Sequence, residues 1–217
     1  FPFLDIGYAL ARDPAHVRAL AERAICLTIP DTTPRETKRA LQELSTARGL
    51  DPLNPWLAAM QAFGLLFAGQ SAAALEAARQ AVALDPDHFT AHWTLALTLA
   101  ALGRHDEALA AAEPALLMSG RNSRILAEVA AIHAARGDLA AAEAIYQEVR
   151  GRAQTGYIGW AEQGAIAASA GHLEAARALV QRAVEARDVF LNFWKLPAWA
   201  PLRADPEGLM VLRSTGL

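Results

Sequence analysis

Apolar and small residues recur along this chain at the spacing of helix faces. From Ala91 to Leu102, apolar positions follow the three- and four-residue spacing of one helical face, and the stretch from Glu107 to Leu117 repeats this pattern. Gly103 lies between the two stretches, where glycine can adopt the left-handed backbone that ends a helix. The pattern therefore predicts two helices joined by a tight turn.

The same pair of helices recurs through the middle of the chain. A glycine stands at the turn of each pair, 34 residues after the one before: Gly69, Gly103, Gly137 and Gly171. Small residues also recur at three other fixed positions of the 34-residue unit, and we call each set of equivalent positions a column. The columns are Ala62, Ala96, Ala130 and Gly164; Ala74, Ala108, Ala142 and Ala176; and Ala81, Ala115, Val149 and Ala183. We expect them where two helices cross, because a larger side chain would hold the backbones apart.

Several helix starts are also marked. A capping side chain precedes a proline at four places, which are Asp13, Thr33, Asn54 and Asp205. Glu36 stands three residues after Thr33 and completes a capping box. Near the N-terminus, these signals predict helices over about 14–27 and 34–48.

The 34-residue period, the small columns and the Asp85-Pro86 link between units resemble the tetratricopeptide repeat. The resemblance implies an all-α fold, a right-handed α-solenoid of helix-turn-helix units. A last repeat leaves an apolar face without a neighbour, so a capping segment is expected to cover it. We expect an irregular N-terminal unit over 1–54, four repeats over 55–88, 89–122, 123–156 and 157–190, and a C-terminal cap over 191–217.

The tail carries a more specific resemblance. Arg187-Asp188, the stretch from Leu202 to Pro206 and the closing Gly216-Leu217 are similar to the end of repeat arrays in bacterial signalling proteins. In those proteins a winged-helix DNA-binding domain, a nucleotide cyclase domain or a serine/threonine kinase domain precedes the repeats. The chain begins at Phe1 rather than Met, so we expect it to be the C-terminal part of a larger signalling or transcription-regulatory protein.

Composition narrows the function classes. A net charge of −3 and a pI near 6.1 argue against direct nucleic-acid binding, which needs a basic surface. Neither a signal peptide nor an apolar run long enough to span a bilayer is visible. We therefore expect no membrane partner and a cytoplasmic location, or a periplasmic one if a membrane span lies upstream. The single cysteine, Cys26, excludes an internal disulfide.

No constellation typical of an enzyme is present. The chain contains no glycine-rich phosphate loop, no nucleophile elbow and no paired cysteines. His88 and His92 lie four residues apart, the spacing of two metal ligands on a helix, but no third ligand is apparent. We favour packed or solvated histidines and expect no catalytic residue, cofactor or metal.

In the tetratricopeptide repeat family, the first helix of each unit lines a concave wall. The residues expected on that wall are Trp56, Ala59, Phe63, Phe67, Thr90, Trp93, Leu97, Arg124, Ala127, Glu128, Ala131, Ile158 and Glu162. The wall is aromatic toward its N-terminal half, which suits an amphipathic helix or an extended apolar peptide segment. The alternative is that these aromatic residues pack against the irregular N-terminal unit, and both interpretations stay open.

The leading hypothesis is a non-catalytic interaction module that binds a polypeptide in the concave groove. One alternative is an oligomerisation or docking scaffold for an upstream effector domain, and another is a small-molecule sensor. Some members of the family grip a C-terminal carboxylate with a set of lysine, asparagine and arginine side chains. The matching positions hold Ala59, Phe63, Thr94, Arg124 and Glu128. Because only Arg124 fits and Glu128 would repel the anion, this mode of binding is rejected.

Overall fold

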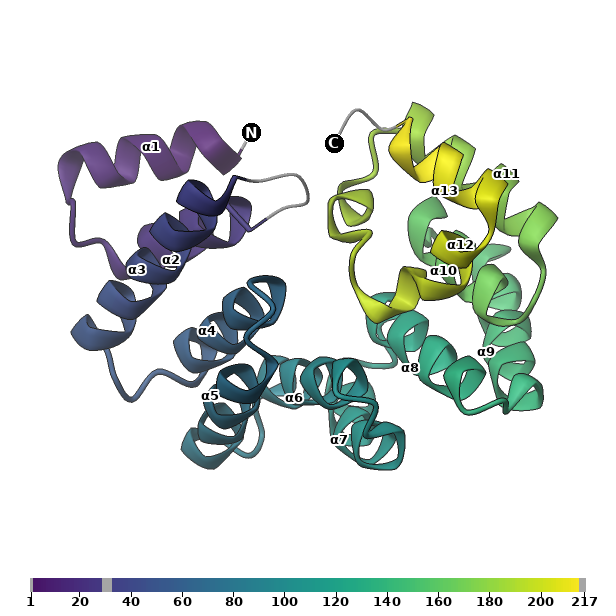
Figure 1. Cartoon of the computed structure of the whole chain (residues 1–217), viewed down its shortest axis with the longest axis horizontal. Helices are drawn as coiled ribbons and strands as arrows, with labels where there is room; N and C mark the ends of the chain where they lie inside the picture. The colour runs from purple at the N-terminus through teal and green to yellow at the C-terminus, as the bar shows by residue number, and fades with distance from the viewer. Residues whose placement is uncertain (1, 29–32, 215–217) are drawn as a thin grey trace. The chain divides into compact units, whose positions relative to one another are not determined.

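The computed structural model describes residues 2–28 and 33–214. All the regular structure within these residues is helical, in helices α1 to α13 and two short 3-10 helices, with no strand (Figure 1). The chain divides into two compact units, residues 1–102 and residues 103–217. The predicted all-α fold is confirmed.

Unit 1 contains the first six helices. They are α1 (Pro2–Arg12), α2 (Val17–Cys26), α3 (Pro34–Leu50), α4 (Pro55–Phe67), α5 (Ser71–Leu84) and α6 (Phe89–Ala101). Helix α2 packs on α3 and α4 packs on α5, while α4 also contacts α6, the first helix of the following pair. Each helix therefore contacts its hairpin partner or a neighbour in the row.

Unit 2 contains further paired helices and ends in shorter segments. Its elements are α7 (His105–Met118), α8 (Ser123–Ala135), α9 (Leu139–Ala153), α10 (Trp160–Ser169), α11 (Leu173–Glu185), η1 (Val189–Phe193), η2 (Pro197–Trp199), α12 (Ala200–Ala204) and α13 (Pro206–Arg213). Helix α8 packs on α9 and α10 packs on α11, and α8 also contacts α10. The pairing seen in unit 1 is thus repeated.

The small-residue columns lie at the helix crossings. All twelve of their residues are buried. At Gly164 the two backbones of α10 and α11 come so close that an added Cβ would lie 2.7 Å from Cγ2 of Val180 and 3.3 Å from the carbonyl oxygen of Ala176. The spacing of small residues in the sequence therefore corresponds to close helix contact.

The repeated glycines end the first helix of each pair. Gly137 has a φ of +79°, in the left-handed region, and its N–H donates to the carbonyl of Ala134. The N–H of Asp138 donates to the carbonyl of His133 at 2.9 Å. These two hydrogen bonds form a Schellman motif, which satisfies carbonyl groups that the end of the helix leaves open.

Three of the four predicted helix starts are confirmed. Thr33 Oγ1 accepts from the N–H of Glu36, and a Glu36 carboxylate oxygen accepts from the N–H of Thr33, which completes the capping box. Asn54 caps α4 by accepting from the N–H of Leu57, and Asp205 caps α13 by accepting from the N–H of Gly208.

The prediction at Asp13 was wrong. Helix α1 occupies Pro2–Arg12, where no helix was predicted, and Asp13 follows its end. The Asp13 carboxylate accepts from the N–H of Ala15, a local turn that competes with a cap. Helix α2 begins at Val17 instead, with His16 Nδ1 accepting from the N–H of Ala19.

The turn residue Gly137 and the helical residue Gly151 should respond to alanine in opposite directions. At Gly137, alanine would have to adopt the left-handed backbone, so we expect Gly137→Ala to lower the free energy of unfolding by about 1 kcal/mol. At Gly151 in α9, an added Cβ meets no atom within 4 Å, so Gly151→Ala should raise the free energy of unfolding by up to about 1 kcal/mol. Urea unfolding followed by circular dichroism measures both, and equal shifts would contradict the assignment of the turn.

Candidate functional site

Three aromatic rings of unit 1 lie together on helices α4 and α6. The ring centroids of Phe63 and Phe67 are 4.8 Å apart, and those of Phe63 and Trp93 are 5.8 Å apart. Phe63 is buried, whereas Phe67 and Trp93 are partly exposed. We call these three residues the aromatic cluster. The structure thus joins three of the residues that the sequence assigned to the wall.

Trp93 contributes a polar group to this cluster. Its indole Nε1 is buried, and none of the described residues accepts a hydrogen bond from it. A buried donor without an acceptor costs about 1–3 kcal/mol compared with a satisfied one. Because the chain's own atoms cover Nε1, an acceptor from another molecule would remove this cost only if the indole turned toward the ligand.

The other predicted wall residues of unit 1 belong to its packing. Trp56 is partly buried against a core cluster to which α1 to α6 contribute, and the Arg18 guanidinium lies 5.5 Å from its ring centroid. Ala59, Thr90 and Leu97 are buried. Trp56 therefore follows the alternative left open above, packing against the N-terminal unit.

In unit 2, the chain covers its own inner helices. Helix α8 contacts η2, and α10 contacts η1, η2 and α12, all parts of the segment of residues 189–204 (Figure 1). Phe190 and Trp199 of this segment are fully buried, with ring centroids 5.4 Å apart. The last helix of the repeats, α11, contacts both α13 and α12. We call residues 189–204 the covering segment.

The predicted wall residues of unit 2 are therefore not open to a partner in this structure. Those that are buried are Ala127, Glu128, Ala131, Ile158 and Glu162. Arg124 is partly exposed, but it donates to a carboxylate oxygen of Glu162 at 3.2 Å, and its guanidinium lies 5.6 Å from the ring centroid of Phe190. The covering segment engages it as well.

Glu128 fastens the covering segment to α8. One of its carboxyl oxygens, Oε2, accepts from the backbone N–H of Ala198 at 2.9 Å, while the other, Oε1, is buried without a partner. Burial raises the pKa of Glu128 to about 8, although the hydrogen bond from Ala198 and the positive charge of Arg203 oppose the shift. The carboxyl group is therefore largely protonated at neutral pH.

Arg203 holds the covering segment from its other side. Its guanidinium donates to the carbonyl oxygens of Trp194 and Leu196, which ties α12 to the turn between η1 and η2. Burial lowers the pKa of this guanidinium, and the Glu128 carboxyl opposes that effect. Glu128 and Arg203 thus each hold the covering segment through hydrogen bonds to its backbone, and among the described residues they form no salt bridge with one another.

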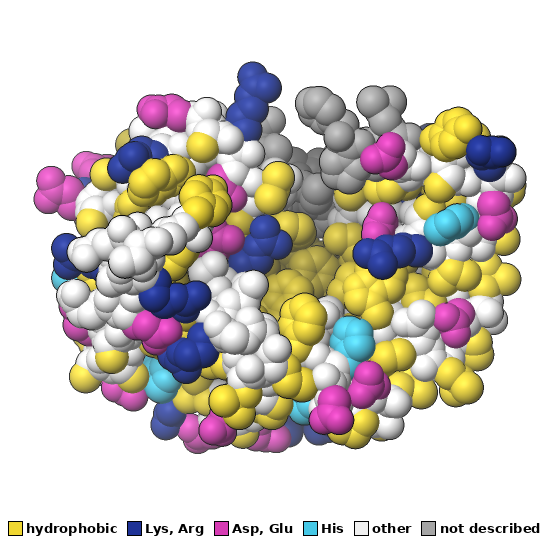
Figure 2. All heavy atoms as spheres, turned by 180° about the vertical axis from the view of Figure 1, so that it is seen from behind, with side chains coloured by type: hydrophobic (Ala, Val, Ile, Leu, Met, Phe, Trp, Pro, Cys, Tyr) yellow, Lys and Arg dark blue, Asp and Glu magenta, His cyan; other side chains and the backbone are white. Residues whose placement is uncertain are grey.

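Other candidate chemistry in the described residues is sparse. His92 Nε2 lies 2.8 Å from the carbonyl oxygen of Pro86, a local contact rather than metal ligation. Residues 2–28 and 33–214 contain no group of three or more histidine, cysteine or acidic side chains placed to hold a metal ion. Within the same residues, no helix has the length and apolarity needed to cross a bilayer. On the face drawn in Figure 2, acidic and basic side chains are interspersed.

The burial of Glu128 predicts a pH-dependent stability. The unfolded carboxyl titrates near 4.5 and the folded one near 8, so between these values the folded chain holds a proton that the unfolded chain releases. Raising the pH through this window must therefore lower the free energy of unfolding. Glu128→Gln has no such proton, so its stability relative to wild type should rise by about 3–4 kcal/mol from pH 5 to pH 8.

Urea unfolding at several pH values measures this difference. Glu174→Gln, at an exposed position of α11, is the matched control and should keep the wild-type pH dependence. If Glu128→Gln retained the wild-type slope, the carboxyl of Glu128 would not be buried as described.

Known proteins share this architecture. The tetratricopeptide repeat family model matches residues 60–123 and 95–157. Among curated proteins, none matches the chain. Many solved structures do, including a tetratricopeptide repeat protein from Parabacteroides merdae, with a TM-score of 0.63 and 15% identity over 99% of this chain and 76% of that one.

Two further structures cover most of both chains. TTC0263, a thermophilic TPR protein of Thermus thermophilus, has a TM-score of 0.60 and 20% identity over 83% of this chain and 90% of that one. YrrB, a TPR protein, has a TM-score of 0.50 and 15% identity over 98% of each chain. At these identities the likeness concerns the fold. Residues 60–157 thus match the tetratricopeptide repeat family model, and the fold is an all-helical array of the tetratricopeptide repeat type.

Proposed function

We propose that this chain is a non-catalytic interaction module that binds a polypeptide segment at the aromatic cluster of unit 1. The observation that carries the proposal is the buried indole N–H of Trp93, which has no acceptor among the described residues and lies beside the rings of Phe63 and Phe67. A peptide can supply an apolar side chain to the partly exposed rings, and a backbone carbonyl to this donor once the indole turns toward the ligand.

The donor favours one of the two ligand conformations that suit an aromatic surface. A helix uses most of its backbone carbonyls in its own hydrogen bonds, whereas an extended segment presents them to its surroundings. Since Trp93 needs an acceptor, an extended apolar segment fits the cluster better than the middle of an amphipathic helix.

The covering segment of unit 2 supports the binding of a polypeptide by analogy. There, a stretch of short 3-10 and α-helical turns lies on the inner helices α8 and α10, buries the rings of Phe190 and Trp199, and pairs a backbone N–H with Glu128. Inner helices of this array are thus able to hold a further polypeptide segment through aromatic burial and a hydrogen bond to its backbone. The proposed ligand of unit 1 would be held by the same kinds of contact.

Proteins of this architecture support the class of function. Tetratricopeptide repeat modules are typically non-catalytic, and YrrB is described as having an unusual peptide-binding site. We further propose a cytoplasmic location and a place within a bacterial signalling or regulatory protein. The support for that context is the resemblance of the tail, from Arg187-Asp188 to Asp205-Pro206.

Peptide selection tests the site. Peptides selected from a random displayed library on the intact chain would be synthesised, and their affinities measured by fluorescence anisotropy. Trp93→Phe keeps a ring but removes the N–H, so we expect affinity to fall about 5- to 10-fold, as for the loss of one hydrogen bond. Trp93→Ala should lower it at least about 50-fold, as for a central aromatic contact.

Leu53→Ala supplies the control, because Leu53 is 75% exposed in the turn before α4 and lies outside the aromatic cluster. Its affinity should match wild type, and circular dichroism should give the same helical content for all variants. Selected peptides that bind Trp93→Ala as tightly as wild type would overturn the proposed site.

A further inference from the structure

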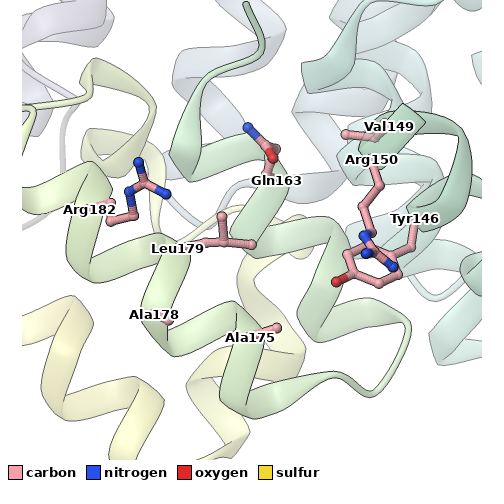
Figure 3. Close-up of a pocket in the computed structure, with 8 residues that line it drawn as sticks. All are labelled: Tyr146, Val149, Arg150, Gln163, Ala175, Ala178, Leu179 and Arg182. Atoms are coloured by element: carbon pink, nitrogen blue, oxygen red, sulfur yellow. The ribbon is translucent and has the colours of Figure 1, made fainter. Parts of the chain in front are cut away.

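A second candidate binding site lies in unit 2, away from the aromatic cluster and from the residues that the sequence assigned to the wall. A cleft of about 300 Å³ is bordered by α9 and α11, with Gln163 of α10 also lining it (Figure 3). Its volume is at the lower end of the range for small-molecule sites. Five of its eight lining residues have apolar or aromatic side chains: Tyr146, Val149, Ala175, Ala178 and Leu179.

Two arginines border the cleft. Figure 3 shows the guanidinium groups of Arg150 and Arg182 at opposite ends of the lining, with Leu179 between them. Each comes from a different helix, Arg150 from α9 and Arg182 from α11. The cleft therefore has an apolar middle and a positive charge toward each end.

Aromatic rings hold both arginines. The Arg150 guanidinium lies 5.5 Å from the ring centroid of Tyr146, and that of Arg182 lies 3.6 Å from the ring centroid of Trp160. Contact with a ring fixes the position of a guanidinium while leaving its N–H groups free to donate in the plane. The rings thus prepare both cations for an anionic partner.

Within the described residues, neither arginine forms a salt bridge. Neighbouring arginines of the same two helices do, since Arg152 pairs with Glu148 and Arg177 pairs with Asp205. The acidic group whose pKa responds to Arg150 is Glu143, and it already accepts hydrogen bonds from Gln147 and His172, each at 2.6 Å. The charges of Arg150 and Arg182 are therefore available to a ligand.

We propose that this cleft binds a small organic anion with two carboxylates separated by an apolar chain. One carboxylate would accept hydrogen bonds from Arg150 and the other from Arg182, because guanidinium groups bind carboxylates through paired N–H groups. The apolar chain would lie against Leu179 and Ala178. This site is independent of the peptide site proposed for unit 1, because it shares none of its residues.

Titration calorimetry with linear dicarboxylates tests the proposal, and the probes are succinate, adipate, suberate and sebacate. We expect saturable 1:1 binding of at least one of them with a dissociation constant below about 1 mM. We also expect affinity to depend on chain length, because the distance between the arginines selects it. The monocarboxylate of the same length should bind at least about 10-fold more weakly.

Variants of the intact chain locate the binding. Arg150→Gln and Arg182→Gln should each weaken the best dicarboxylate at least about 10-fold, whereas Arg213→Gln, at an exposed position of α13, should leave it unchanged. Ala178→Trp alters no charge but fills the cleft, so it should abolish binding. This variant tests the site independently if an arginine variant perturbs the fold.

Three results would overturn the proposal. The first is an absence of saturable binding for all four dicarboxylates, and the second is equal affinity for wild type and both arginine variants. The third is tight binding of a short acidic peptide at Arg150 and Arg182 without binding of any free dicarboxylate, which would assign the cleft to a protein partner instead.

Discussion

The array depends on how closely its helices can approach at their crossings. At Gly164 there is no room for even one added carbon between α10 and α11, and the other small columns are buried in the same way. Close approach lets neighbouring helices exclude water along their whole contact, which is the main source of stability in repeat proteins whose units contact only their neighbours. Because the columns recur every 34 residues, each crossing has the same requirement, and the left-handed glycines set the turn that brings the next helix to its crossing. The aromatic cluster and the cleft both lie between helices positioned by these contacts.

Much of this architecture is predictable because it follows from local chemistry. The caps at Thr33, Asn54 and Asp205 involve atoms within three residues of one another, and the turn glycines act through their own backbone. The prediction failed at Asp13, where two local options compete: a carboxylate can cap a helix or close a turn, and the burial of Ile6 and Leu10 of α1 in the core decides between them. That burial is a long-range property, and a short amphipathic helix before a proline gives little sign of it.

The candidate sites were harder to predict for the same reason. The sequence placed Phe63, Phe67 and Trp93 on one wall because the first helices of consecutive repeats are expected to line it, and the structure brings these rings together. It could not indicate that the segment after α11 would fold back onto α8 and α10, since the contact between Glu128 and Ala198 joins residues 70 apart. The sequence did not predict the cleft between α9 and α11, because arginines on the second helices of repeats ordinarily belong to a solvated face. Only the rings beneath Arg150 and Arg182 distinguish them from the paired arginines nearby.

The covering segment has a consequence for competition. It follows α11 after a short connection, so it meets α8 and α10 as a tethered ligand with an effective concentration on the order of millimolar. A free peptide directed at the same helices would have to outcompete this internal occupant at its own, much lower, cellular concentration. Weak and non-specific ligands are therefore excluded from these helices of unit 2. Only a molecule whose binding free energy exceeds that supplied by Phe190, Trp199 and the Ala198 N–H would displace the covering segment.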